Sequence, residues 1–506
     1  MKKIIMLVIG VLSMSISQAQ DINDALRYSS GEIKGSARFQ AMSGAFGALG
    51  GDISAISANP AGSAVFTSSY ASISLGNQNN DNNTSYFSGN RNTSNSTIDL
   101  SQGGGVFVFK NNNTDSPWRK FTLGIAFDNT KNYENDWRAN GTGNVSVGQY
   151  FLANAQGLRL DEISAFTGES TTDAYSAIGS AYGYQNQQAF LGYDSYILEP
   201  NTFDDDNTAY TSNIAGNSFK QNYNYVANGY NGKISFNAGA QYNDNIYLGL
   251  NLNSHFLNYE RYTSFYETNT NSASLVQEVL FDNTLISNGS GFSFQLGGIF
   301  KLTNELRAGL TYDSPTWMTI EEETTQYLET LVIDDVNGDF YQIVDPNIIN
   351  IFPSYRIQTP SKITGSLAYV FGKQGLISFD YSRKDYSKTK FKPTSDSYFD
   401  SQNSIMENTL TAASTYKIGA EYKVNQFSFR GGYRLEESPY ADGKTIGDLT
   451  GYSLGLGYNF GNTNLDLAFS NSKQDRNNQL FNAGLTDTVA LENSNSNITL
   501  TLGFKL

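Results

Sequence analysis

The chain has 506 residues, with 33 Lys and Arg against 48 Asp and Glu, a formal net charge of −15, one His and no Cys. The acidic balance argues against a nucleic-acid partner, because a phosphate backbone repels it. The lack of cysteine excludes disulfides and cysteine-based metal sites, and one histidine leaves little room for a zinc site or for most His-dependent catalysis. We therefore expect no cofactor, no metal and no enzyme activity.

The first residues are typical of a secretory signal. Lys2 and Lys3 precede a short apolar run at 4–16, and Ser17-Gln18-Ala19 offers a small-x-small cleavage site. The apolar run is too short to cross comfortably a bilayer core of about 30 Å. We expect 1–19 to be a signal peptide that exports the chain.

Residues 20–68 do not alternate like strands. They are rich in glycine and small side chains, as in the run 35–52 and in Asn59-Pro60-Ala61-Gly62. Such residues permit tight backbone packing. This segment is interpreted as a compact hatch or plug inside a lumen, the alternative being a periplasmic tail.

From residue 69 onward, segments of roughly ten residues alternate apolar with small or polar side chains, as transmembrane strands do. Tyr452, Leu454 and Leu456, for example, interleave with Ser453 and Gly455. In a strand this places every apolar side chain on one face. A soluble β-sandwich predicts the same alternation, so the connections must decide between the two folds.

The connections alternate in length. Short ones occur at 243–245, 303–304, 372–374, 425–426 and 461–462, with a somewhat longer one at 111–117. Long polar stretches lie near 78–96, 138–220, 268–289, 321–357, 391–411, 437–449 and 476–495. Short turns on one side and long extracellular loops on the other are typical of an outer-membrane barrel. We predict that 69–506 form an all-β, antiparallel transmembrane barrel of about fourteen strands in the cell outer membrane.

Two of the long stretches have unusual composition. Residues 146–190 contain Ala-rich, helix-compatible segments, and 328–356 mix many apolar residues, including Ile349 and Phe352, into a loop. An apolar loop either packs on its neighbour or forms a hydrophobic entry surface. Ile349 and Phe352 are therefore candidate ligand contacts.

The sequence resembles the FadL/TodX family of outer-membrane transporters for hydrophobic compounds. The resemblance covers nearly the whole chain after the signal and is strongest in the hatch, at Arg38, 43–46, Asp52, Ala55 and 59–62. Further similar stretches are 249–253, 308–315, 359–363 and 377–382. The chain departs from better-known members by its largest loop, 138–220, after the third strand.

The resemblance implies a fourteen-stranded barrel that is closed by the hatch and passively takes up long-chain fatty acids or aromatic hydrocarbons. It also implies lateral release through a kink in the third strand, contacted by the hatch motif Asn59, Pro60 and Ala61. In the segment 121–127 Gly124 is the candidate kink, since glycine permits bulges. The alternative is that Gly124 only makes room for the hatch.

A ligand with a carboxylate head would favour a cation in the lumen. Strand alternation points Arg430 and Lys417 inward, which makes them candidate ligand contacts, and Asp380 and Asp466 also face the lumen. The alternative is an ion-pair belt that braces barrel and hatch.

Three motifs suggest other activities but fit poorly. Gly451–Gly455 matches G-x-S-x-G, yet that motif needs a strand–turn–helix and here lies in an alternating strand. His255 adjoins Ser254 in a strand, so the two side chains face opposite sides, although His255 could still pair with a distant Ser. Asp335, Asn337 and Asp339 resemble the start of a calcium loop that lacks its later glycine and glutamate, and a solvated acidic turn is the alternative.

The expected partners are a hydrophobic small-molecule ligand and outer-membrane lipid. The large loops also suit a protein partner. The alternative function is therefore a FadL-like barrel of the PorV type, which serves as a subunit of a secretion or outer-membrane assembly machine; the fold alone does not separate these functions.

Overall fold

The structure, a computed structural model, describes residues 21–506 except 114 and 335. The predicted signal peptide, 1–19, lies outside these residues. Within them, no helix has the length and apolarity to cross a membrane.

Over the described part of the chain, the strands form one closed antiparallel barrel of 14 strands, which confirms the predicted fold class. The last strand pairs with the first, from Tyr70 opposite Lys505 to Ser85 opposite Ala490, and so closes the ring. Several barrel strands consist of consecutive segments. In chain order, the first six strands are β1 (Tyr70–Tyr86), β2 (Gly89–Lys110), β3 (Trp118–Asn132) continued by β4 (Asn135–Gly143), β7 (Phe219–Tyr242), β8 (Ile246–Thr268) and β9 (Val276–Lys301). The seventh is β10 (Leu306–Asp313) continued by β11 (Trp317–Val332); the eighth consists of β12 (Phe340–Val344), β13 (Asn350–Ile351), β14 (Tyr355–Gln358) and β15 (Lys362–Phe371); and the ninth is β16 (Gly375–Asp385) continued by β17 (Lys390–Lys392). The last five are β18 (Ala412–Val424), β19 (Phe427–Glu436), β20 (Leu449–Asn459), β21 (Thr463–Gln479) and β22 (Thr488–Lys505).

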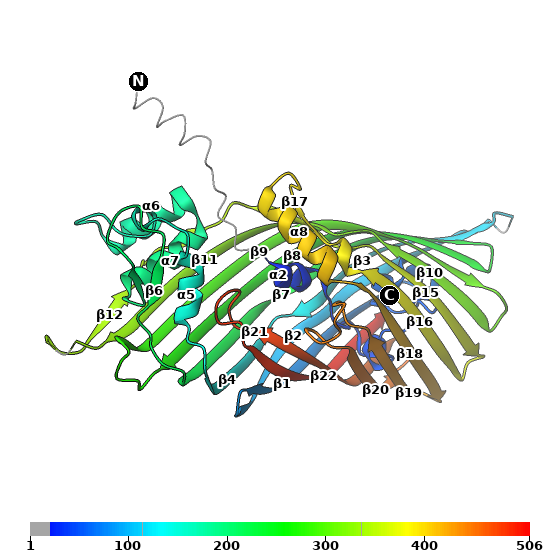
Figure 1. The fold of residues 1–506 in the computed structure, drawn as a ribbon. Coiled ribbons are helices and arrows are strands. Elements are labelled where there is room, and N and C mark those ends of the chain that lie inside the picture. The colour runs from blue at the N-terminus through cyan, green and yellow to red at the C-terminus, as the bar shows by residue number, and fades with distance from the viewer. Residues whose placement is uncertain (1–20, 114, 335) are drawn as a thin grey trace, which may run out of the picture.

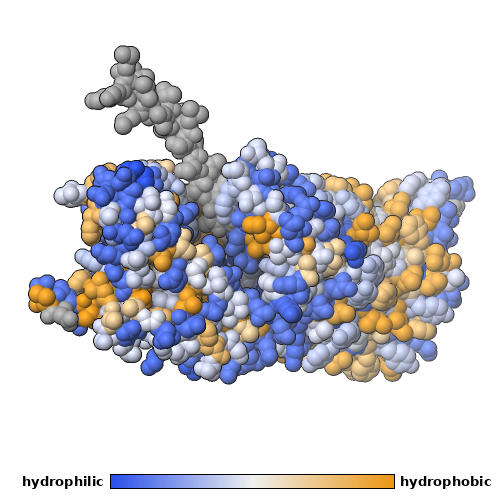
Figure 2. Space-filling model, viewed as in Figure 1, coloured by the Kyte–Doolittle hydropathy of each residue, from blue (hydrophilic) through white to orange (hydrophobic). Residues whose placement is uncertain are grey.

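The two faces of the wall differ as the alternation predicts. On β20, Leu454 is 59% exposed on the outside, whereas Ser453 beside it is buried on the inside. Outward apolar residues of this kind occur around the barrel on the half that carries the short turns, and Figure 2 shows them gathered on the right of the molecule. A continuous outward apolar belt of this kind is what a bilayer core requires.

The short connections are tight turns. Asn243, Asn425, Gly372 and Gly461 have positive φ, the conformation that hairpin turns demand. These turns lie at the end of the barrel opposite the helices α5, α6 and α7, which gather at the left in Figure 1.

Several predicted loops are shorter than expected because the strands extend beyond the apolar belt. β1 and β2 pair as far as Tyr86 and Gly89, inside the predicted loop 78–96. β21 and β22 likewise pair as far as Gln479 and Thr488. The same holds within the predicted loops 268–289 and 321–357, where β8, β9 and β11 continue. In β1 and β2 both faces are polar beyond the belt, so the apolar alternation that indicates a strand is absent there. In β9 and β11 the inward face beyond the belt is apolar instead, as at Val279 and Leu328, because it packs against the loops above.

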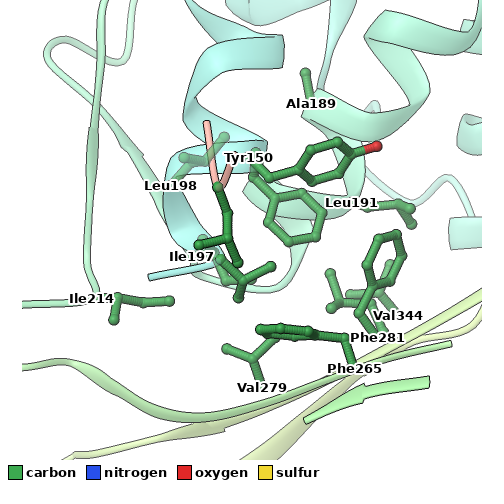
Figure 3. Packing of buried hydrophobic residues seen from close by; sticks show 14 of the residues in the cluster. Tyr150, Ala189, Leu191, Ile197, Leu198, Ile214, Phe265, Val279, Phe281 and Val344 are labelled. Atoms are coloured by element: carbon green, nitrogen blue, oxygen red, sulfur yellow. The ribbon is translucent and has the colours of Figure 1, made fainter. Parts of the chain in front are cut away.

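The largest loop folds into a helical cap, as its composition predicted. It contains α5 (Gly148–Ala155), the turn η2 (Leu160–Glu162), α6 (Thr171–Tyr182), α7 (Tyr184–Asp194) and the hairpin of β5 (Leu198–Pro200) with β6 (Tyr210–Ser212). α6 begins at the N-cap Ser170 and ends at Gly183, whose φ of 97° suits a helix end. The cap packs on the ends of the barrel strands in one apolar cluster, in which Tyr150 and Leu191 face Phe265 and Phe281 (Figure 3).

The N-terminal segment is helical and lies in the lumen. It consists of α2 (Ile22–Ser29), α3 (Ala37–Ala41), α4 (Ala55–Ala58) and the 3-10 turn η1 (Pro60–Val65). α2 has a capping box between Asp21 and Asp24 and packs in a cluster with Phe399 and Met406 of α8 (Ser397–Thr409), beside it in Figure 1. We call residues 21–68 the hatch; its outer boundary remains a prediction.

Candidate functional site

The hatch motif caps a turn and holds the hatch to the wall. The Asn59 side-chain oxygen accepts the N–H of Ala61 at 3.0 Å, while its Nδ2 donates to the carbonyl of Gly298 in β9 at 3.1 Å. The carbonyl of Pro60, the first residue of η1, accepts from Asn237 Nδ2 of β7 at 2.9 Å. The motif therefore contacts β7 and β9, and the next turn of η1 reaches β3.

Two wall glycines allow this approach. A Cβ at Gly297 would lie 2.0 Å from the Asn59 oxygen, and one at Gly249 would lie 2.2 Å from the carbonyl carbon of Pro60. Neither contact is sterically possible, so any side chain at these positions would push the hatch inward.

A buried ion-pair network fastens the hatch on the other side of the lumen. Glu421 of β18 accepts from Arg38 Nε of the hatch at 2.9 Å and from Arg430 Nε of β19 at 2.7 Å. Arg430 Nη1 also donates to Asp466 of β21 at 2.6 Å. Arg430 thus belongs to an ion-pair network that joins barrel and hatch, as its alternative interpretation predicted. Its role in ligand binding stays a prediction. We call Arg38, Glu421, Arg430 and Asp466 the brace.

Lys417 lies in β18 directly opposite Asp380 of β16. Asp380 in turn accepts the backbone N–H groups of Phe46 and Gly47, each at 3.0 Å, so it serves as a cap for the hatch chain. Lys417 faces the lumen beside this contact, and a ligand role for it remains a prediction.

The G-x-S-x-G serine also holds the hatch. Ser453 lies within β20 and donates to the carbonyl of Ala41 at 2.9 Å, and its hydroxyl lies 2.8 Å from that of Ser43. His255 pairs with a distant serine, since its Nε2 lies 2.8 Å from Ser293 Oγ in the adjacent strand β9. Ser453 thus has a structural role, in a strand rather than at a strand–turn–helix elbow.

The barrel wall loses its backbone ladder at one seam. β2 and β3 pair regularly from Lys110 opposite Lys120 to Gln102 opposite Asp128, and the described residues show no pairing between them beyond that point. Gly124 lies inside the regular part, opposite Val106. The pairing of β3 with β7 is irregular between Asn129 and Lys131, five or more residues beyond Gly124. The break in this strand is therefore outward of the predicted kink.

Above the seam, β4 lies behind the β1–β2 hairpin. Inward-facing side chains of β1 donate to backbone carbonyls here: Asn80 to Glu134, just before β4, at 2.6 Å, and Asn82 to Asp136 of β4 at 2.9 Å. β4 itself pairs with β7. Side-chain hydrogen bonds thus replace a backbone ladder between these neighbouring parts of the wall.

The hatch covers the seam from inside. The N–H of Glu32 donates to the carbonyl of Thr130 at 2.9 Å, and Lys131 Nζ donates to Ser30 Oγ at 2.6 Å. Three residues beyond Glu32, the N–H of Gly35 donates to Ser101 Oγ of β2 at 3.0 Å. Residues 30–35 therefore bind both strands of the seam.

The carboxylate of Asp99 joins the hatch, β2 and β3. Asp99 of β2 accepts from Lys34 Nζ of the hatch at 2.6 Å. It also accepts from the Nδ2 atoms of Asn129 and Asn132 of β3, at 3.2 and 3.1 Å. We call Asp99, Lys34, Asn129 and Asn132 the seam latch.

On the outside, the seam faces the edge of the apolar belt. Ile98 of β2 is 75% exposed, and Leu100 beside it is also exposed. The outer surface beside the missing ladder is therefore apolar.

The latch was not among the sequence-predicted residues. A signal existed, because Asp99 alternates between the outward apolar residues Ile98 and Leu100 and must face the lumen. The sequence does not indicate that β3 would leave β2 at this level, or that Lys34 would reach it.

The two candidate ligand contacts in the outer loop, Ile349 and Phe352, differ in exposure. Phe352 is buried and packs its ring against Tyr184 of α7 at a centroid distance of 6.2 Å, whereas Ile349 is exposed. Burial raises the pKa of Tyr150 in the cap above its usual value, because water is excluded there. Tyr150 and Phe352 are thus both buried, and Phe352 packs on its neighbour.

Asp335 of the candidate calcium loop lies outside the described residues. In the same turn, Asn337 Nδ2 donates to Asp334 at 2.9 Å, and the N–H of Asp334 donates to Asp339 at 3.2 Å. Among the residues with a described position, no group of three or more His, Cys, Asp or Glu is placed to hold a metal.

Neither a protein-family model nor a curated protein sequence matches this chain. Among solved structures, the chain is similar to a FadL homologue of Pseudomonas aeruginosa, with 12% identity, a TM-score of 0.55, and coverage of 94% of this chain and 100% of the other. It is also similar to a deletion mutant of the monoaromatic hydrocarbon channel TodX, with 12% identity, a TM-score of 0.50, and coverage of 93% and 99%. The likeness to the FadL/TodX family is thereby confirmed for the fold.

Proposed function

We propose that this protein is an outer-membrane barrel that passively takes up hydrophobic small molecules and releases them sideways through the seam between β2 and β3. The observation that carries this proposal is that the ladder ends where the hatch covers the wall from inside and Ile98 and Leu100 are exposed outside. The fold of a FadL homologue and of a monoaromatic hydrocarbon channel supports it.

Uptake of this kind needs no energy input. Burying each CH₂ group contributes about 0.8 kcal/mol, so a hydrophobic solute moves spontaneously from water to an apolar surface and on into the bilayer. What the barrel must supply is a path through the charged outer surface, and the hatch must keep that path closed to polar solutes.

The experiment is uptake by intact cells that carry this barrel in the outer membrane and lack a comparable transporter. Labelled oleate and labelled toluene are given separately, because the chain resembles transporters of both classes. Deleting residues 20–62 should change permeation while the barrel still assembles, as judged by its heat-modifiable mobility in gel electrophoresis.

The lateral step has its own variant. In Gly31→Cys/Thr130→Cys, a Cβ at position 31 would lie 3.6 Å from the Thr130 carbonyl oxygen, so a short thiol-specific cross-linker that reductants cleave would hold the hatch over the seam. Cross-linking should lower uptake and a reductant should restore it. Unchanged uptake would contradict release at this seam. A stoichiometric protein partner on purification, without a lipid-like ligand, would favour a secretion or assembly subunit instead.

A further inference from the structure

A cavity lies beneath the hatch, away from the seam. It has a volume of about 380 Å³ and is bounded by the hatch at Leu49, Val65 and Phe66. Its wall residues adjoin the short turns, as Leu376 and Tyr458 do. The cavity therefore opens at the end of the barrel opposite the helical cap, and we call it the vestibule.

The vestibule is positively charged in an acidic protein. Two carboxylates line it, Asp52 and Asp466, against five cations, which are Arg38, Arg307, Lys423, Arg430 and Lys505. Glu421 of β18 binds three of these cations but does not itself line the cavity. The side chains around the cavity thus carry more positive than negative charge, whereas the whole chain has a net charge of −15. A concave surface of one sign attracts ions of the other.

Arg307 has the most available guanidinium. Its Nη1 donates to the carbonyl of Leu49 at 3.3 Å, and its buried Nε has no hydrogen-bond partner among the described residues. Directly across the strand pair lies Lys301, another cation, and the described residues form no ion pair with either. Like charges directly opposite each other in a sheet are destabilising, and an anion in the cavity beside Arg307 would relieve the repulsion.

The rest of the lining is apolar. Leu49, Val65, Phe66, Val370 and Leu376 share the cavity with the cations. A bound anion would therefore be stabilised further by a short hydrocarbon tail, at about 0.8 kcal/mol for each CH₂ that leaves water.

We propose that the vestibule binds a small amphipathic carboxylate, with the carboxylate at Arg307 and Lys423 and the tail against the underside of the hatch. This site is separate from the lateral route, and binding to it does not depend on the proposed function. Because Lys423 lies 3.4 Å from Glu421 of the brace, the ligand would compete for a cation that helps to fasten the hatch.

Calorimetric titration of the purified barrel in a non-ionic detergent tests this proposal. Hexanoate is the probe, hexanol lacks the charge and inorganic phosphate lacks the tail. Hexanoate should bind at least about tenfold more tightly than either, since a charge-assisted hydrogen bond and tail burial each contribute more than 1 kcal/mol. Equal affinity for hexanol or for phosphate would overturn the proposal.

Variants locate the site. Arg307→Gln and Lys423→Gln should each weaken hexanoate binding by about tenfold, the loss of one charge-assisted bond. Lys423 has a half-exposed side chain, so its replacement leaves the barrel folded even if the Arg307 variant does not fold. Lys373→Gln is the matched control, since this exposed lysine in a short turn does not line the cavity. Equal weakening in the control, or none in Lys423→Gln, would contradict this placement.

Discussion

Lys34 Nζ lies 2.6 Å from Asp99 Oδ2, and this ion pair joins the hatch to the strand at which the wall loses its ladder. The Lys34 side chain is almost fully buried and that of Asp99 is 15% exposed, so solvent screens the pair only in part. Its strength is therefore that of a charge-assisted hydrogen bond, about 1.5–3 kcal/mol.

Lys34→Met should loosen the seam. The substitution keeps much of the side-chain volume but removes the charge, and Asp99 keeps only the two asparagine amides as partners. We expect faster uptake of oleate or toluene by cells, together with faster protease cleavage within 30–35. Lys444→Met, in an exposed loop, should behave like the unmodified protein. Slower uptake in Lys34→Met would show that the latch supports transport instead of restraining it.

A second prediction concerns movement of the hatch as a whole. In Ser43→Cys/Ser453→Cys the two sulfurs replace hydroxyls that lie 2.8 Å apart, so a disulfide forms between hatch and β20 with little backbone movement. The chain has no cysteine of its own, which makes the bridge unambiguous. If transport requires the hatch to leave the wall, oxidation should reduce uptake severalfold and reduction should restore it.

The control bridge lies within the wall. Thr364→Cys/Ser382→Cys joins β15 to β16 through hydroxyls 2.8 Å apart and involves no hatch residue. Its oxidation should leave uptake unchanged. Full uptake by the oxidised Ser43/Ser453 variant would mean that movement of 30–35 alone is sufficient.

The barrel was predictable because apolar and small or polar side chains alternate with a period of two residues along the strands of its apolar belt. Leu454 and Ser453 must face opposite sides, and one apolar side per strand leaves little choice of architecture. The polar ends of β1 and β2 were not predictable, since the side chains of both faces are polar there and no apolar alternation remains. For this reason the loop at 78–96 was predicted too long.

The site was predictable only in part. Alternation correctly turned Arg430 and Asp466 inward, but Glu421, which binds Arg430, also binds Arg38 of the hatch, 383 residues away in sequence. Gly124 stays a predicted kink, whereas the pairing of β3 becomes irregular beyond Asn129, where the N–H of Glu32 from the hatch and Asn80 of β1 bond the carbonyls of Thr130 and Glu134. Contacts between segments this distant leave no local pattern.

The brace gives a stability prediction. Glu421→Gln leaves Arg38 and Arg430 beside a neutral amide in a buried site, and breaking a buried pair in this way costs about 3–5 kcal/mol. The heat-modifiable band should unfold at a lower temperature, and the hatch should become accessible to protease. Glu305→Gln, in an exposed turn, should change neither. An unchanged unfolding temperature in Glu421→Gln would mean that the network contributes little.

The last prediction separates the hatch from the barrel. Gly297→Ala would place a Cβ 2.0 Å from the Asn59 oxygen, in a contact that only displacement of the hatch can relieve. Gly365→Ala is the matched control, because a Cβ on this strand glycine meets no atom within 4 Å. Both variants should assemble with the same heat-modifiable mobility, since the ladder itself is untouched. Only Gly297→Ala should admit small polar dyes or antibiotics to cells, as the displaced hatch no longer seals the lumen. Equal exclusion by both variants would show that the close contact of the motif with β9 is not what closes the barrel.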